Sequence, residues 1–262
     1  MQTSSDPSID SSNAGAHVRE AEHSEGRNAY IYDADCIDSR EVFALFVKSA
    51  PATAQPPAGG RGTVRIVQHA GHDYVVRHYH RGGKLAGLSQ DRYVWNGFGA
   101  SRPWREWRLL AELYASGLPV PRPLAARLTR RGAIYRADLA TALVPAAGSL
   151  AERALWAPID ESVWRQIGRV IWDFHAHGVC HADLNAHNVL LTDGGAQIWL
   201  LDFDKARRRQ LDTAWQRSNL DRLKRSLDKL RGENPHMHFS PHEWHCLFGA
   251  YSKASNASPS SN

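Results

Sequence analysis

Apolar positions in the middle of the chain recur first at helical and then at strand spacing. Large apolar residues three or four positions apart predict a helix with one buried face. They are Trp164, Ile167, Val170, Ile171 and Phe174. Two short apolar runs follow at residues 189–191 and 198–201, with a Thr-Asp-Gly-Gly turn signal between them. This order predicts a core helix, a loop and then a hairpin of two buried strands.

The first half of the chain has the alternation of a β-sheet. Residues 64–67 and 74–79 alternate apolar and polar side chains on either side of a turn at Gly71. Residues 134–144 predict further strands that close this part of the chain. Residues 145–148 then predict a hinge, since proline and glycine interrupt regular structure there. We therefore expect two lobes, of which the first is mainly β.

Composition fits a soluble globular protein, with 42% hydrophobic and 23% charged residues among 262. No run of 18 apolar residues occurs and the N-terminus is polar, so neither a spanning helix nor a secretory signal is predicted. The chain has three cysteines, Cys36, Cys180 and Cys246. Their odd number and wide spacing fit reduced thiols and not a set of disulfides. The cytosol is the expected compartment.

The formal net charge of +5 indicates an anionic partner. Charge alone does not choose among nucleic acid, a phosphorylated substrate and an acidic membrane surface. One basic group comprises residues 207–209, and a second lies on an apparently helical segment. The second group is Arg222, Lys224, Arg225, Lys229 and Arg231. A solvated helix face and a partner site are equally good interpretations of the second group.

The segment after the core helix contains the residues of a phosphotransfer site. Phosphoryl transfer needs a carboxylate to accept the proton of the attacking hydroxyl and oxygen ligands for Mg²⁺ beside ATP. Asp183 and Asn188 are five residues apart (188 − 183), as in an H-x-D-x-x-x-x-N loop that here begins at His181. Asp202 follows fourteen residues later (202 − 188). We expect Asp183 to be catalytic, Asn188 and Asp202 to bind the metal, and His181 to brace the loop.

Two features of the first half could contact the ATP phosphates. Gly60 and Gly62 precede the first alternating strand, and glycines there let backbone N–H groups approach phosphate. The next strand carries Arg77 where protein kinases have a lysine. Lys84, in a second glycine-rich basic segment, is the alternative to Arg77. We favour Arg77 because it lies within the strand.

A helix should supply a glutamate that pairs with this cation. It begins near Pro103, which suits a first turn, and runs to Gly117. Glu106 lies at the margin of the apolar stripe, whereas Glu112 is expected to face solvent. Glu106 is therefore the predicted partner of Arg77.

Four histidines near the C-terminus resemble a metal cluster only superficially. His242 and His245 are three positions apart, one fewer than in the H-E-x-x-H motif, whose spacing puts both rings on one helical face. Pairing or packing roles are favoured over a structural zinc site for these two and for His236 and His238.

In combination, these segments resemble the lipopolysaccharide core kinases, and within them the kinases of 3-deoxy-D-manno-octulosonic acid (Kdo). The matching segments are residues 76–83, 102–110, 117–123, 181–191, 201–205 and 219–227, and the resemblance spans roughly residues 28–250. It implies an α+β, bilobal protein-kinase-like fold with a mainly β N-lobe and a mainly helical C-lobe. The lobes are expected at residues 28–144 and 145–252, between a disordered tail at 1–27 and a frayed tail at 253–262.

The resemblance also implies an activity and a location. The expected reaction is transfer of the ATP γ-phosphate, with Mg²⁺, to the 4-hydroxyl of Kdo on a Kdo-lipid A precursor. The expected place is the cytoplasmic side of the cell inner membrane, where a peripheral protein with a basic surface meets anionic lipid. No nucleic acid is expected as a partner, and no obligate protein partner is evident.

Some residues depart from the protein-kinase pattern. An arginine, Arg77, replaces the strand lysine, and Asp202-Phe203-Asp204 replaces Asp-Phe-Gly. Asn185 stands where protein kinases have a catalytic-loop lysine, so charge on the substrate side is expected from elsewhere, such as Lys205 or Arg207.

Two alternative functions stay open. One is a kinase of another sugar, of a small molecule or of a protein hydroxyl, because the fold does not determine the acceptor. The other is a catalytically silent nucleotide-binding protein, which the presence of Asp183, Asn188 and Asp202 disfavours.

Overall fold

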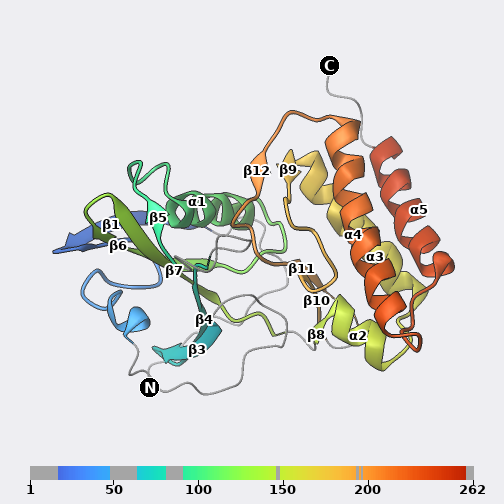
Figure 1. The fold of residues 1–262 in the computed structure, drawn as a ribbon, viewed down its shortest axis with the longest axis horizontal. Helices are drawn as coiled ribbons and strands as arrows, with labels where there is room; N and C mark the ends of the chain where they lie inside the picture. Colours follow the sequence, from blue (N-terminus) through green and yellow to red (C-terminus); the bar gives the residue numbers. More distant parts are fainter. Residues whose placement is uncertain are drawn as a thin grey trace, which may run out of the picture.

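The computed structural model describes residues 17–47, 64–80, 91–145, 148–192, 195 and 197–257. Most of the strands lie in the first half of these residues and most of the helices in the second half. The large sheet with helix α1 forms one side of the molecule, and helices α3, α4 and α5 form the other (Figure 1). This is the α+β, bilobal arrangement expected from the sequence.

The larger sheet has seven strands, all paired antiparallel. Its path runs β1-β2-β6-β7-β4-β3, and β5 also pairs with β7. In chain order the strands are β1 Glu20–Glu25, β2 Asn28–Asp33, β3 Val64–His69, β4 His72–His78, β5 Tyr93–Val94, β6 Pro123–Arg131 and β7 Ile134–Ala142.

The hairpin of β3 and β4 determines where Arg77 points. Its two turn residues, Ala70 and Gly71, have φ of 50° and 81°. Positive φ at both positions is typical of a type I′ turn, whose twist matches that of the two strands. Because side chains alternate along a strand, Val75 and Arg77 lie on one face of β4 and Val76 on the other. Arg77 therefore lies on the face that meets α1.

Helix α1 (Arg102–Ala115) packs on β6 and β7. Pro103 lies in its first turn, where a missing N–H costs nothing because that group has no partner within the helix. The buried side of α1 consists mainly of Trp104, Trp107, Leu109, Leu110 and Leu113. Glu106 lies among them with only 2% of its surface exposed.

The second half of the chain combines helices with two small sheets. Strand β10 lies between β11 and β8, and β12 pairs with β9. The small strands are β8 Gly148–Ser149, β9 Val179–Cys180, β10 Val189–Leu191, β11 Ile198–Leu200 and β12 Arg207–Arg208. The helices are α2 Leu150–Trp156, α3 Glu161–Ala176, α4 Thr213–Glu233 and α5 Pro241–Ala257, and a 3-10 turn, Ala44–Phe46, lies in the first half.

Two segments expected to lack structure contain regular elements. Strand β1 lies within residues 1–27 and pairs along its whole length with β2. The prediction of disorder through residue 27 was therefore wrong for β1, because pairing and ion pairs stabilise a strand that has few large apolar residues. Trp104 donates a hydrogen bond to Glu22 (2.8 Å), and Arg108 pairs with Glu20 (2.6 Å). Helix α5 likewise continues to Ala257, beyond the predicted fraying point at residue 253.

Candidate active site

Arg77 lies at the centre of a network that joins the sheet, α1 and the segment after β11. Its Nη2 donates to Oε1 of Glu106 at 2.5 Å, and its Nη1 donates to Oδ1 of Asp202 at 3.0 Å. The Glu106 side chain is 1% exposed, whereas that of Asp202 is 39% exposed. One guanidinium thus holds a buried carboxylate and a solvent-facing carboxylate in fixed positions.

Tyr79 completes the buried end of this network. Its hydroxyl donates to Oε2 of Glu106 at 2.6 Å, so both oxygens of that carboxylate are bonded. Burial raises the pKa of Glu106, and the charge of Arg77 opposes that change. Burial lowers the pKa of Arg77, but Glu106 and Asp202 more than offset this and raise it above its usual value. Arg77 is therefore a permanent cation that is held by two carboxylates.

The loop after β9 is braced by His181. The ring Nε2 of His181 lies 2.8 Å from the carbonyl oxygen of Leu201, and its Nδ1 accepts from the backbone N–H of Asp183 at 3.3 Å. These partners assign the ring proton to Nε2. Burial lowers the pKa of His181, which favours the neutral ring. His181 is 2% exposed, so it ties the loop to the end of β11 and is shielded from a substrate.

Asn188 and Asp183 belong to the same loop. The Nδ2 of Asn188 donates to the backbone carbonyl of Asp183 at 2.9 Å, and the N–H of Leu201 donates to the carbonyl of Asn188 at 2.9 Å. Because its nitrogen is engaged, the amide oxygen is the atom of Asn188 that could bind a metal. The side chain of Asp183 is 57% exposed, so its carboxylate is open to solvent.

The Asp202-Phe203-Asp204 motif has a left-handed residue at its start. Asp202 has φ of 62°, a conformation that aspartate tolerates better than most residues do. Phe203 packs on His181 and Phe174, with ring centroids 4.9 and 5.8 Å away. Asp204 accepts from Nε of Arg102 at 2.6 Å. The three consecutive residues thus have separate roles. Asp202 faces Arg77, Phe203 packs in the core, and Asp204 binds α1 through Arg102.

Several of these residues line a cleft of about 540 Å³. Its apolar walls include Val64, Ile66, Val75, Leu139 and Leu190, and residues 143–145, next to the expected hinge, also line it. Arg77, Glu106, Asn188 and Asp202 line its polar part. A mainly apolar cleft with a few charged groups in its lining suits a nucleotide, because its base has flat apolar faces and its phosphates are anionic.

A larger hollow, of about 870 Å³, lies elsewhere. It is lined by Val76 and His78, which alternate with Val75 and Arg77 along β4, so it lies on the opposite face of the sheet. Among the described residues, none of the predicted phosphate or metal residues lines it. The smaller cleft is therefore the candidate active site.

The predicted residues come together in part. Arg77, Glu106, Asn188 and Asp202 meet in the cleft. Glu112, the rejected alternative, is exposed and pairs with Arg208. Gly60, Gly62 and Lys84 lie outside the described residues, so the glycine loop and the choice of Arg77 over Lys84 stay predictions.

Two contacts of the site were not predicted. One is the Arg102–Asp204 ion pair, which replaces the flexibility of a glycine with a fixed link to α1. The other is Arg222 on α4, whose Nη1 is 3.9 Å from Oδ1 of Asp183. A sequence signal existed for Arg222, since it belongs to the second basic group, but nothing in that group distinguished it from its neighbours.

The cleft has donors of the type that Mg²⁺ prefers. The carboxylate of Asp202 and the amide oxygen of Asn188 are hard oxygen ligands, and both line the cleft. Arg77 supplies a cation beside them for phosphate oxygens. The residues present therefore fit a magnesium–nucleotide complex.

Comparisons with known proteins show the family of this chain. A family model, the lipopolysaccharide kinase (Kdo/WaaP) family, matches residues 49–251. A protein of Xylella fastidiosa (strain M12) named 3-deoxy-D-manno-octulosonic acid kinase is 45% identical over 202 residues, which is 76% of this chain and 80% of that protein. A protein of the same name from Stenotrophomonas maltophilia (strain K279a) is 42% identical over 209 residues, 79% of this chain and 83% of that one.

A solved structure is similar at a greater distance. It is the Rio2 kinase-ADP/Mg2+-phosphoaspartate complex from Chaetomium thermophilum, with a TM-score of 0.49 and 15% identity, covering 84% of this chain and 76% of that one. The family assignment rests on the sequence matches. The family model covers most of the chain and the relatives share more than two fifths of the aligned residues, so the chain belongs to the lipopolysaccharide kinase (Kdo/WaaP) family.

Proposed function

We propose that the protein transfers the γ-phosphate of ATP to the 4-hydroxyl of the Kdo residue of a Kdo-lipid A precursor, a step of lipopolysaccharide core biosynthesis. The observation that carries the proposal is the convergence of Arg77, Asn188 and Asp202 on one cleft whose neighbouring loop presents Asp183. The names of the two relatives, both 3-deoxy-D-manno-octulosonic acid kinases, supply the sugar.

The roles of the residues follow from their positions. Asp183 accepts the hydrogen bond of the attacking hydroxyl and orients it toward the phosphorus. Arg77, fixed by Glu106, holds the phosphates in line with that hydroxyl. Asn188 and Asp202 would hold Mg²⁺, which when bound neutralises charge on the transferred phosphoryl group. The proton that Asp183 receives leaves to solvent, since its side chain is more than half exposed.

On the acceptor side, Arg222 is the cation placed to bind an anionic group. Kdo is a sugar acid, and a guanidinium binds a carboxylate through two parallel hydrogen bonds. Arg222 has 48% of its side chain exposed beside Asp183, so a carboxylate could approach it while the sugar hydroxyl meets Asp183. We assign this role to Arg222 in preference to Lys205 or Arg207, because Arg222 is the one of these three described cations that forms an ion pair with Asp183.

The same reaction places the protein at a membrane surface, because its acceptor is a lipid. Among the described residues, no helix is long and apolar enough to cross a bilayer. Residues 207–209 are exposed and basic, and each suitably placed Lys or Arg is worth about 1 kcal/mol at an anionic surface. The proposal is peripheral attachment to the cytoplasmic side of the inner membrane. Co-sedimentation with acidic vesicles should be lost in high salt.

The decisive test uses labelled ATP, magnesium and three acceptors: a Kdo-bearing lipid A precursor, the same precursor without sugar, and a generic protein. We expect label on the Kdo-bearing lipid alone, and none with the Asp183→Asn protein. Label on the sugar-free precursor or the protein would make the enzyme a kinase of another acceptor. ATP binding without transfer to any of the three would make it a silent nucleotide-binding protein.

A further inference from the structure

Helices α3 and α5 approach each other more closely than they could if the residue at their contact had a side chain. A Cβ built on Gly168 of α3 would lie 2.1 Å from the carbonyl oxygen of Leu247 on α5, far inside contact distance. The two backbones therefore meet directly at this glycine. Such contact fixes the relative position of side chains elsewhere along the same pair of helices.

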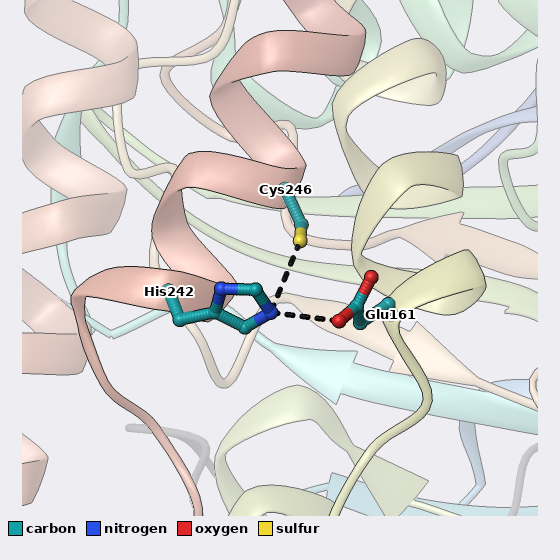
Figure 2. A group of neighbouring side chains, drawn as sticks. All are labelled: Glu161, His242 and Cys246. Carbon is teal, nitrogen blue, oxygen red and sulfur yellow. Dashed lines mark hydrogen bonds and ion pairs between the residues drawn. The ribbon is translucent and has the colours of Figure 1, made fainter.

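Three potential metal ligands meet where these two helices begin. Glu161 is the first residue of α3, and His242 and Cys246 lie one turn apart on α5 (Figure 2). Nε2 of His242 is 2.7 Å from Oε1 of Glu161 and 3.8 Å from Sγ of Cys246. One ligand atom from each residue lies within 4.8 Å of the other two. Figure 2 shows the imidazole between the thiol and the carboxylate, with the same ring nitrogen facing both.

We propose that Glu161, His242 and Cys246 form a binding site for one zinc-class divalent transition metal. Zinc takes a carboxylate oxygen, an imidazole nitrogen and a thiolate sulfur at about 2.0–2.3 Å. Tetrahedral geometry then separates nitrogen from sulfur by about 3.6 Å and nitrogen from oxygen by about 3.4 Å. The observed 3.8 Å needs almost no change. The observed 2.7 Å is a hydrogen bond that must lengthen, which the exposed carboxylate of Glu161 allows.

Arg165 has the position of an outer partner of this site. It donates to Oε2 of Glu161, the oxygen that does not face His242. Ligating carboxylates are commonly hydrogen-bonded through their second oxygen, which orients them. Arg165 also approaches Sγ of Cys246 at 4.0 Å, so the same cation attracts the thiolate that the metal requires.

Metal binding changes the protonation of two groups. The thiol of Cys246 loses its proton to solvent, since only the thiolate is a ligand. The neutral ring of His242 must carry its proton on Nδ1 to leave Nε2 for the metal. Glu161 binds as the carboxylate, and solvent fills the fourth position. The site is therefore neutral with a divalent ion, and binding weakens at low pH.

The site differs from the histidine cluster that the C-terminal sequence suggests. His245 is exposed on α5 outside this group, and His236 and His238 precede the helix. The third ligand, Glu161, is 81 residues away in the sequence (242 − 161). A bound metal would join the first turns of α3 and α5, and none of its three ligands lines the cleft. The expected role is thus a clamp that stabilises the packing of α5 on α3.

The experiment titrates metal-free, full-length protein with Zn²⁺ against a chromophoric chelator and with Co²⁺ under anaerobic conditions. We expect one tight zinc per chain and a thiolate-to-cobalt charge-transfer band, with a higher Tm in zinc than in chelator. Cys246→Ser should abolish the band and, like His242→Gln, weaken zinc binding by more than the roughly 10- to 100-fold typical of losing an outer partner. Arg165→Gln should weaken it by an amount within that range.

The matched control is His245→Gln, which removes another exposed histidine of α5 and should leave zinc affinity unchanged. Because His242 and Glu161 also form an ion pair, each variant is compared with wild type in chelator, and only the zinc-induced change in Tm counts. A charge-transfer band that persists in Cys246→Ser, or zinc affinity equal in His242→Gln and His245→Gln, would overturn the proposal. Absence of any stoichiometric zinc binding by the wild-type protein would overturn it as well.

Discussion

Arg222 of α4 places its Nη1 3.9 Å from Oδ1 of Asp183 in the loop that follows β9. This separation is an ion pair but is too long for a hydrogen bond. Both side chains are about half exposed, so the guanidinium keeps donors that an acceptor can engage while Asp183 engages the hydroxyl. In the proposed function, this pair would link the chemistry at Asp183 to recognition of an anionic acceptor.

Replacing Arg222 by Gln tests that link. We expect kcat/KM for the Kdo-bearing acceptor to fall about 10- to 100-fold, because a charge-assisted hydrogen bond contributes about 1.5–3 kcal/mol. The KM for ATP should hardly change, since Arg222 is not among the residues lining the cleft. Steady-state kinetics with each substrate varied separately measures both. Lys229→Gln, an exposed cation on the same helix, is the control. Equal losses in the two variants would mean that the basic face acts only through its total charge.

Asp183→Asn should separate chemistry from nucleotide binding. The amide has nearly the same shape but cannot accept the proton, so kcat should fall about 10²- to 10⁴-fold. Nucleotide affinity should stay near the wild-type value, because Asp183 does not line the described cleft. Single-turnover transfer and equilibrium binding of a labelled ATP analogue measure the two quantities. Retention of more than a tenth of the activity would contradict the assigned role.

The two glutamates of α1 give a matched comparison. Glu106→Gln removes the charge that faces Arg77 in a buried site, and breaking a buried pair costs about 3–5 kcal/mol of the free energy of unfolding. We also expect kcat/KM for ATP to fall, since Arg77 loses the group that orients it. Glu112→Gln breaks an exposed pair with Arg208 and should change stability by less than about 1 kcal/mol. Urea unfolding and ATP kinetics are measured on both variants. Equal losses of stability in Glu106→Gln and Glu112→Gln would contradict the prediction that the buried pair matters more.

The sequence predicted those parts of the site whose residues lie close together in the chain or on an element with a clear pattern. The spacing of Asp183, Asn188 and Asp202 lies within twenty residues, and the structure joins them through one loop and one hairpin. The pairing of Arg77 with Glu106 was also predicted, because each lies on an element with a clear pattern. The pair Arg102–Asp204 spans 102 residues, and no local pattern connects its two members.

Strand β1 was missed for a different physical reason. Its composition is polar, and composition measures only how much apolar surface a segment can bury. The strand is stabilised by pairing with β2 and by ion pairs with α1, neither of which depends on large apolar residues. In the same way, Glu161 and Cys246 carry no metal signal until the contact of α3 with α5 brings them together.

Acid should destabilise the protein through His175. Burial lowers the pKa of His175 to about 4, and a hydrogen bond with the side chain of Asn219 opposes part of that change. Because the unfolded chain binds the proton with a pKa near 6.5, it holds more protons than the folded chain between pH 6.5 and 4. Stability is therefore full above pH 6.5 and falls as the pH decreases through that range.

The expected loss from His175 alone is about 2 kcal/mol between pH 7 and pH 5. Urea unfolding at the two pH values measures it. His175→Gln keeps a polar partner for the hydroxyl of Tyr251, which lies 2.9 Å from Nδ1 of His175, but cannot be protonated. The free energy of unfolding of this variant should differ less between pH 7 and pH 5 than that of the wild type, whatever its stability at pH 7. An unchanged difference would assign the pH dependence to other groups, of which His181 is the first candidate because burial lowers its pKa as well.

Gly168→Ala should destabilise the protein even though alanine is the better helix former. In the interior of a helix this change normally contributes up to about 1 kcal/mol of stability. Here the added Cβ would lie 2.1 Å from the carbonyl of Leu247, so α5 must move away from α3. Overpacking of this kind costs about 1–3 kcal/mol, which outweighs the gain in propensity. Gly249→Ala on α5 meets no atom within 4 Å and should stabilise the protein instead. Opposite signs in thermal unfolding of the two variants would establish the close contact, and a stabilised Gly168→Ala protein would refute it.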